Sequence, residues 1–190
     1  MTNVTFDTKS KIVEKGAFLA NNSSNLEIYL PNNVTTIKES AFEDCQVKKI
    51  VLPDSVTSIG DRAFYDSNIN ITALPPNLTF LGSNAFYYSN IGISELPEGV
   101  TSLKSSTFNS CDNIKTITLH DKIKTLFSFC FGWCDYLTTV TFLGTPTYLD
   151  SSAFYGCNKL TTINVPWSSG EVSGAPWGAT KATINYNYGG

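Results

Sequence analysis

The sequence predicts a mainly β solenoid, an elongated coil of about seven repeated units. The first observation behind this fold class is a short pattern centred on one phenylalanine, which recurs at Phe18, Phe42, Phe64, Phe86, Phe108, Phe131 and Phe154. Successive phenylalanines are 24, 22, 22, 22, 23 and 23 residues apart. The second observation is a segment of alternating apolar and polar residues in each unit, rich in Ile, Leu, Val and Thr. A period this constant indicates supersecondary units that stack on one another and share one core.

Within each unit we predict two short strands and one compact turn. In the third unit, the alternating residues 47–52 predict a strand with one buried face, and Pro53 ends it. Residues 56–59 alternate again and predict a second strand. The Ala63–Phe64 segment follows neither period, so we place it in a helical or 3₁₀ turn.

This frame resembles the BspA-type leucine-rich repeat, whose consensus runs approximately Leu-x-x-Ile-x-Ile-Pro-x-x-Val-x-x-Ile-Gly-x-x-Ala-Phe-x-x-Cys. The resemblance covers about residues 4–166. It implies a right-handed coil of 22–24-residue units in which parallel strands of successive units form a continuous sheet. The departures are local: Thr107 and Cys130 replace the small alanine, His120 and Leu143 replace the proline, and the first unit lacks a clear leucine strand.

We divide the chain into a degenerate N-terminal repeat and cap at residues 1–25, a leucine-rich repeat solenoid at 26–166, and a C-terminal cap at 167–190. A stack exposes strand edges and apolar side chains at both ends, so each end needs a cover. Trp167 and Trp177, among Gly and Pro, predict a turn-rich plug, and residues 182–188 predict a final strand. The alternative is a flexible tether. Residues 165–179 are also similar to terminal segments of repeat proteins encoded by gut bacteria and their phages.

Composition favours a protein that does not bind nucleic acid. The net charge is -3, Arg62 is the single arginine, and no run of basic residues occurs. We find no apolar signal-peptide region in residues 1–15 and no stretch of apolar residues long enough to span a membrane. Five cysteines, an odd number, favour a reducing compartment. We therefore expect the protein in a virion or in host cytoplasm, with release by lysis.

The cysteines first suggest a zinc site, because Cys130 and Cys134 lie near His120 and Cys111. However, four cysteines come three residues after an anchor phenylalanine (Cys45, Cys111, Cys134 and Cys157), and Cys130 takes the alanine position of its unit. We interpret them as a ladder of small buried residues, because zinc requires converging ligands and a ladder directs them in parallel. His120 should be exposed at a coil corner. We expect no metal, no cofactor and no catalytic residues, and hence no enzyme.

Two surface stripes are the candidate partner-binding residues. On the sheet face, the outward positions include Tyr29, Thr116, Thr118, Thr139 and Thr141. Beside the anchor phenylalanines lie Tyr65, Tyr87, Tyr88, Trp133 and Tyr155. Aromatic side chains on a turn suit contact with a protein or glycan, although stacked tyrosines can equally stabilise neighbouring coils. In the two middle units the strand register is ambiguous, and we favour Ile71 and Ile93 facing inward.

The sequence therefore predicts a non-enzymatic recognition module that binds a protein or glycan partner on an extended repeat surface. The family resemblance implies adhesion or host interaction, and the ending suggests a phage tail-associated component of a larger assembly. Two alternatives remain: an intracellular phage or bacterial effector that sequesters a host protein, and a structural spacer. We expect no nucleic-acid partner and no membrane span.

Overall fold

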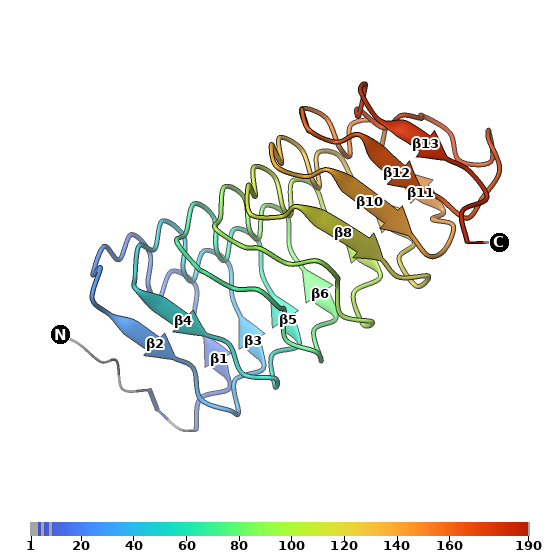
Figure 1. Cartoon of the computed structure of the whole chain (residues 1–190). Helices are drawn as coiled ribbons and strands as arrows, with labels where there is room; N and C mark the ends of the chain where they lie inside the picture. The colour runs from blue at the N-terminus through green and yellow to red at the C-terminus, as the bar shows by residue number, and fades with distance from the viewer. Residues whose placement is uncertain (1–3, 5, 8, 190) are drawn as a thin grey trace.

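The computed structural model of the protein describes residues 4, 6–7 and 9–189. The chain winds into a parallel β solenoid, with its two termini at opposite ends of the stack (Figure 1). The predicted fold class is therefore confirmed. The strands are β1 (Ile12–Val13), β2 (Glu27–Tyr29), β3 (Thr36–Ile37), β4 (Lys49–Val51), β5 (Ser58–Ile59), β6 (Phe80–Leu81), β7 (Ser102–Leu103), β8 (Thr116–Leu119), β9 (Thr125–Leu126), β10 (Thr139–Phe142), β11 (Tyr148–Leu149), β12 (Thr162–Asn164) and β13 (Thr183–Asn185).

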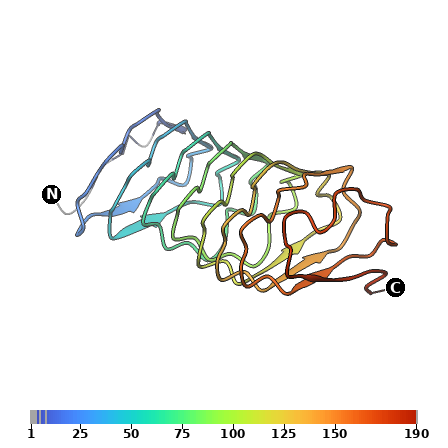
Figure 2. The same ribbon diagram turned by 90° about the horizontal axis from the view of Figure 1, so that it is seen from above.

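The strands lie on two sides of the coil, which we call the front and the back. The front carries β2 paired with β4 and, further along, the sheet β8–β10–β12–β13. The back carries β1–β3–β5–β6 and β7–β9–β11. Pairing is parallel and in register, so that Thr139 lies beside Thr116 on one side and Thr162 on the other. Figure 2 shows the successive coils stacked from the N-terminal to the C-terminal end.

The core is a column of phenylalanine rings that runs along the coil axis. From Phe18 to Phe154, neighbouring anchor rings have centroids 4.9–5.8 Å apart and planes within 16° of one another. From Phe42 onward these rings are fully buried. Equal spacing in the sequence has become equal spacing in space, because each unit contributes one turn of the coil.

The predicted helical or 3₁₀ turn was wrong in detail, since the described residues contain no helix. Each anchor instead has beside it at least one hydrogen-bonded four-residue turn whose third residue has a positive φ, as type II turns require. Ala41 N donates to Lys38 O with Ser40 at φ 55°, and Ser89 N donates to Phe86 O with Tyr88 at φ 55°. Positive φ cannot continue a right-handed helix.

The front sheet is interrupted in the middle of the molecule. Residues 68–74 and 90–94 form no strand, and the front backbone there is joined by isolated contacts such as Gly92 N to Ile71 O at 2.9 Å. A single bridge pairs Glu95 with Thr118. Ile93 is buried and Ile71 packs partly buried against the core, which agrees with the inward register. Figure 1 shows the gap between β4 and β8.

The segment after residue 166 adds one more turn to the stack. β13 pairs in parallel with β12, and Phe154 N donates to Trp177 O at 2.9 Å, as each earlier anchor does to the following unit. Trp177 and Trp167 are buried and contact each other with centroids 6.1 Å apart. At the other end, Phe18 stacks on Phe42 and β1 pairs with β3.

Candidate binding surfaces

The structure places the predicted aromatic residues on the outside of the turn side, which we call the turn ridge: Tyr65, Tyr87, Tyr88, Trp133 and Tyr155. Because each anchor phenylalanine points inward, these aromatic side chains, one or two positions after an anchor, lie toward the outside. Tyr88 is 62% exposed, Tyr155 51% and Trp133 42%, whereas Tyr65 and Tyr87 are half-buried. The ridge therefore offers aromatic surface at Tyr88 in the fourth unit and at Trp133 and Tyr155 in the later units.

The earlier part of the ridge is occupied by its own contacts. The Tyr65 and Tyr87 rings are stacked at 4.8 Å, and the Arg62 guanidinium lies 3.9 Å from the Tyr65 ring centroid. Arg62 is held by two hydrogen bonds to Glu43, and these lower the pKa of the Glu43 carboxyl. One face of Tyr65 meets Tyr87 and the guanidinium covers its ring, so this pair serves contact between coils.

The later part of the ridge is an exposed aromatic cluster, formed by Phe129, Trp133 and Tyr155. Trp133 lies 5.3 Å from Phe129 and meets Tyr155 edge-on at 5.2 Å, while Phe129 and Tyr155 are 5.9 Å apart. Sequence reasoning missed Phe129. Its signal was an aromatic residue two positions before the anchor, where other units carry Gly, Ser, Arg or Asn.

Gly156 fixes the position of the indole in this cluster. Its φ is +79°, and a Cβ added there would lie 2.6 Å from Trp133 Cδ1. The tryptophan can therefore lie flat against the next coil only because that position has no side chain. This close approach holds the aromatic cluster in one arrangement.

The sheet-face candidates divide into two groups that the structure does not bring together. Thr116 and Thr118 of β8 are exposed, and Thr139 and Thr141 of β10 lie beside them half-buried. Tyr29 belongs to β2, beyond the interruption of the front sheet; it is 53% exposed and its hydroxyl donates to Glu27 Oε2 at 2.8 Å.

The threonine row continues as an amide ladder toward the end of the coil. Asn164 Nδ2 donates to Thr141 Oγ1 at 3.1 Å, and Asn185 Nδ2 donates to Asn164 Oδ1 at 2.8 Å. Sequence reasoning did not select Asn185, although the repetition of Thr-Ile-Asn at 162–164 and 183–185 was a usable signal. Because these amides bond from strand to strand, they stabilise the pairing of β12 with β10 and β13.

The cysteines are buried, as the packing interpretation predicted. Three thiols donate to the carbonyl oxygen of the preceding unit's anchor: Cys111 to Phe86 at 2.9 Å, Cys134 to Phe108 at 3.1 Å and Cys157 to Phe131 at 2.9 Å. Ser67 makes the same bond to Phe42 O at 3.0 Å. Burial raises the pKa of Cys45 to about 11 and raises the pKa of Cys111 and Cys134. These thiols are not in the nucleophilic thiolate form at neutral pH.

The prediction that His120 is exposed was wrong, since its side chain is only 8% exposed. The ring takes the place of the proline of other units and lies against the preceding corner, where Nε2 is 3.1 Å from Pro97 O. The imidazole is buried at this corner as the ring of Pro53 is in the third unit, and only Nε2 has a hydrogen-bond partner among the described residues.

Two shallow depressions flank the strand-free segment of the fourth unit, which contains Thr72, Ala73 and Leu74. One, of about 410 Å³, lies between this segment and residues 94–98 of the fifth unit. The other, of about 480 Å³, lies between it and residues 50–52 of the third unit. They occur where a strand of the front sheet is missing.

Among the residues that the structure describes, no helix is long and apolar enough to cross a membrane.

Comparison with known proteins agrees with this geometry. A family model described as the BspA type leucine rich repeat region (6 copies) matches residues 1–114 and 58–175. No curated protein sequence matches the chain. A crystal structure of a leucine-rich repeat protein from Bacteroides ovatus ATCC 8483 is similar over 97% of this chain and 60% of that one, with 18% sequence identity and a TM-score of 0.56. This similarity shows the fold.

A leucine rich cell surface protein from Faecalibacterium prausnitzii A2-165 matches over 86% of this chain and 60% of its own, with 20% identity and a TM-score of 0.40. The chain thus spans 60% of the length of each of these two relatives.

Proposed function

Because this chain belongs to the BspA-type leucine-rich repeat family, whose repeats generally serve binding, we propose that it is a recognition module for a protein or glycan partner. The aromatic cluster of Phe129, Trp133 and Tyr155 is the contact surface. The observation that carries this proposal is the exposure of Trp133 and Tyr155 on a turn side whose backbone is fixed by bonds between coils.

Aromatic side chains of this kind supply much contact area at a small entropic cost. Trp and Tyr are enriched among the residues that dominate binding energy. The cluster is also preorganised, because Trp133 packs against Gly156 and Phe129 before any partner arrives. A preorganised surface loses less conformational freedom on binding.

The finer part of the proposal concerns where the module acts. We place the partner on a host surface, with the module as an adhesion component of a virion or another larger assembly. The support for a phage origin is the resemblance of residues 165–179 to terminal segments of gut bacterial and phage repeat proteins. Neighbouring tail and lysis genes would agree with this placement, and neighbouring early or defence-linked genes would instead indicate the effector.

The test is a binding screen against a glycan array, a host surface extract and host cytosol, followed by affinity measurements on variants. Trp133→Ala and Tyr155→Ala should each weaken binding to the captured partner by at least about tenfold. The matched control is Tyr29→Ala, an equally exposed aromatic on the front of the coil, which should change the affinity less than about twofold.

The outcomes separate the competing functions. Loss of binding in Tyr29→Ala but not in the cluster variants would move the site to the front sheet. A partner found only in cytosol would favour the sequestering effector. A protein that retains nothing from any of the three sources would be a structural spacer.

A further inference from the structure

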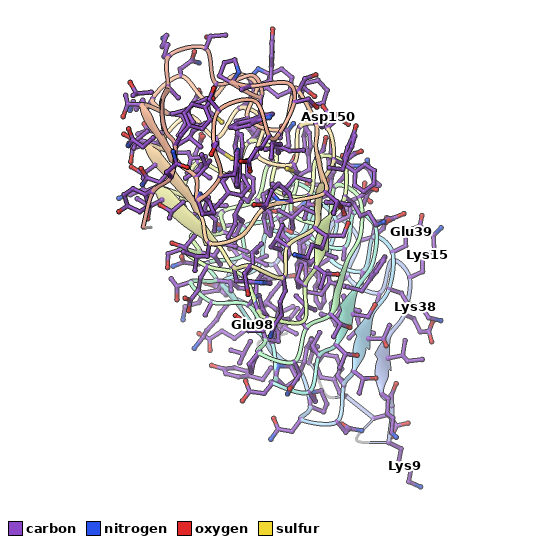
Figure 3. All side chains as sticks on the ribbon, turned by 90° about the vertical axis from the view of Figure 1, so that its right-hand side faces the viewer. Lys9, Lys15, Lys38, Glu39, Glu98 and Asp150 are labelled. Carbon is purple, nitrogen blue, oxygen red and sulfur yellow. The ribbon has the colours of Figure 1, made fainter. Side chains whose placement is uncertain are left out.

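Three side chains that can ligate a metal meet at the corner shared by the fifth and sixth units. Glu98 follows Pro97 in the fifth unit, while His120 and Asp121 occupy the equivalent two positions in the sixth. One ligand atom from each of Glu98, His120 and Asp121 lies within 4.8 Å of the others. Figure 3 shows Glu98 on a different side of the coil from Lys15, Lys38 and Glu39, so this corner is separate from the ion pairs of the first turns.

The buried imidazole supplies an independent indication of a ligand. Nε2 lies 3.1 Å from Pro97 O, a group that can only accept, so Nε2 carries the proton in the neutral ring. Nδ1 then carries a lone pair, and it is buried without a hydrogen-bond partner among the residues that the structure describes. In metal sites, a ligating histidine typically donates its other N–H to a backbone carbonyl or carboxylate. His120 already has this arrangement.

From this geometry we propose that Glu98, His120 and Asp121 form a binding site for a divalent first-row transition-metal ion, with Zn²⁺ as the best match. One imidazole nitrogen and two carboxylate oxygens suit zinc, whereas Mg²⁺ and Ca²⁺ favour sites made of oxygen alone. Nδ1 of His120 is the nitrogen ligand.

The protein needs only small side-chain movements to close this site. Ligands with bonds of about 2.0–2.1 Å around tetrahedral zinc stand roughly 3.4 Å apart. The carboxylates of Glu98 and Asp121 lie at the surface and can rotate, while the buried ring of His120 stays in place. Three protein ligands leave a fourth position for water or for an oxygen of a partner.

Two lysine side chains lie at this corner, and one of them competes with a metal ion for a ligand. Lys122 Nζ lies 2.7 Å from Glu98 Oε2, and Lys124 Nζ donates to the backbone oxygen of Asp121 at 2.9 Å. The Lys122 pair is exposed on both sides, and such surface pairs are weak. Lys122 contacts one carboxylate oxygen, so a cation can use the other or displace the ammonium group.

A metal ion here would join two units where their strand pairing is sparse. Glu98 belongs to the unit that lacks a regular front strand and is linked to β8 by the single bridge from Glu95 to Thr118. Glu98 also lines the 410 Å³ depression, so the ion lies at the rim of that surface. The site would therefore reinforce the junction and offer an open coordination position beside a hollow.

The test is calorimetric titration of the untagged full chain with ZnCl₂, together with metal analysis after dialysis against micromolar ZnCl₂. We expect one zinc per chain and a raised melting temperature with zinc. His120→Pro restores the residue found at this position in other units, and it should weaken zinc binding at least about tenfold, as should Asp121→Asn. Lys122→Ala should tighten it, because it removes the competing cation.

Asp54→Asn is the matched control. Asp54 follows Pro53 at the corner equivalent to Glu98, without a neighbouring histidine, and its removal should leave zinc affinity unchanged. If His120→Pro does not fold, Asp121→Asn and Glu98→Gln decide. Absence of retained zinc, or zinc binding that survives all the variants at this corner, would overturn the proposal, and tighter binding of Ca²⁺ or Mg²⁺ than of Zn²⁺ would overturn the choice of metal.

Discussion

The anchor phenylalanines show how one residue type, repeated, determines the interior of the molecule. Each ring is stacked on the ring before and after it, so every internal anchor contacts two others. Phe86 lies in the middle of this column, between Phe64 and Phe108. Loss of one ring therefore removes apolar contacts on both sides and leaves a cavity that the coil cannot easily close.

We predict that Phe86→Ala lowers the free energy of unfolding by about 3–5 kcal/mol in chemical denaturation. Phe80→Ala is the control from the same unit, because Phe80 is 44% exposed on the back sheet. It should cost less than about 1 kcal/mol. Equal losses for the two variants would show that the column is not the main source of stability.

The buried thiols give the protein a predictable response to alkali. In the unfolded chain a thiol ionises near pH ~8.5, whereas burial raises the pKa of Cys45 to about 11 and raises the pKa of Cys111. Above pH ~8.5 the unfolded state releases protons that the folded state keeps, so the free energy of unfolding falls as pH rises toward the folded pKa. This contribution is fully present below pH ~8.5.

We therefore expect urea denaturation to show decreasing stability between pH ~8 and ~10.5. Replacing Cys45, Cys111 and Cys134 with serine should flatten this dependence, because a hydroxyl does not ionise in this pH range. The variant should keep its fold, because a serine can make the bond that Ser67 makes to Phe42 O. Binding to a partner should be unchanged in this variant. An equally steep pH dependence in both proteins would assign it to groups other than the thiols.

At the scale of the element, strands could be predicted where apolar and polar residues alternate clearly. They could not be predicted where the backbone does not pair with the strand of the neighbouring unit. The Thr-rich segments of the later units became β8, β10 and β12 in register. In the fourth unit the apolar content was also present, but residues 69–74 lead into Pro75–Pro76 and form no strand. The two depressions result from the missing front strand of this unit, so no sequence motif could predict them.

At the candidate sites, the sequence predicts a side chain's position when it depends on its own unit, but not when it depends on contacts with another unit. Exposure of Trp133 and Tyr155 could be predicted, because each follows an inward anchor ring within two residues. Burial of His120 could not, because it depends on the carbonyl of Pro97 in another unit. Phe129 belongs to the aromatic cluster through its contacts with Trp133 of its own unit and Tyr155 of the next unit.

The turn beside the aromatic cluster gives a prediction about glycine. Gly156 and Gly170 both have positive φ, 79° and 89°, but a Cβ at Gly156 would strike Trp133 whereas Gly170 has nothing within 4 Å. An alanine at either position bears the backbone cost of about 1–2 kcal/mol. Gly156→Ala should cost more than Gly170→Ala and should shift the fluorescence of Trp133. Equal costs and unchanged emission would mean that the indole moves aside freely.

For the whole molecule, stability depends on each coil being covered by the next. Trp177 shows this at the last turn: its backbone oxygen accepts from Phe154 N, as the residue before each following anchor does in the earlier units, and its side chain is fully buried. The repetition of Thr-Ile-Asn at 162–164 and 183–185 could have predicted a further unit, but no anchor phenylalanine marks it. The last turn of the stack is one more coil with a different interior.

Deleting residues 167–190 should therefore expose Phe142 and Phe154 together with the open edge of β12. We predict association or aggregation of the truncated chain, measured by size-exclusion chromatography with light scattering, because an uncovered parallel edge can pair with another chain. Full-length protein at the same concentration is the control. A monomeric truncated protein with an unchanged melting temperature would identify the segment as a tether.

The interruption of the front sheet also determines where the molecule should resist stretching least. Between the fourth and fifth units the described residues show no strand pairing on the front, and β6 and β7 are not paired on the back. This junction is held by the turn side, by the front bond from Gly92 N to Ile71 O, and by the contact of Phe86 with Phe108. In a linear array each junction transmits load only to its neighbour. Tension applied to the two ends should part the molecule here first, into two halves that each keep their own sheets.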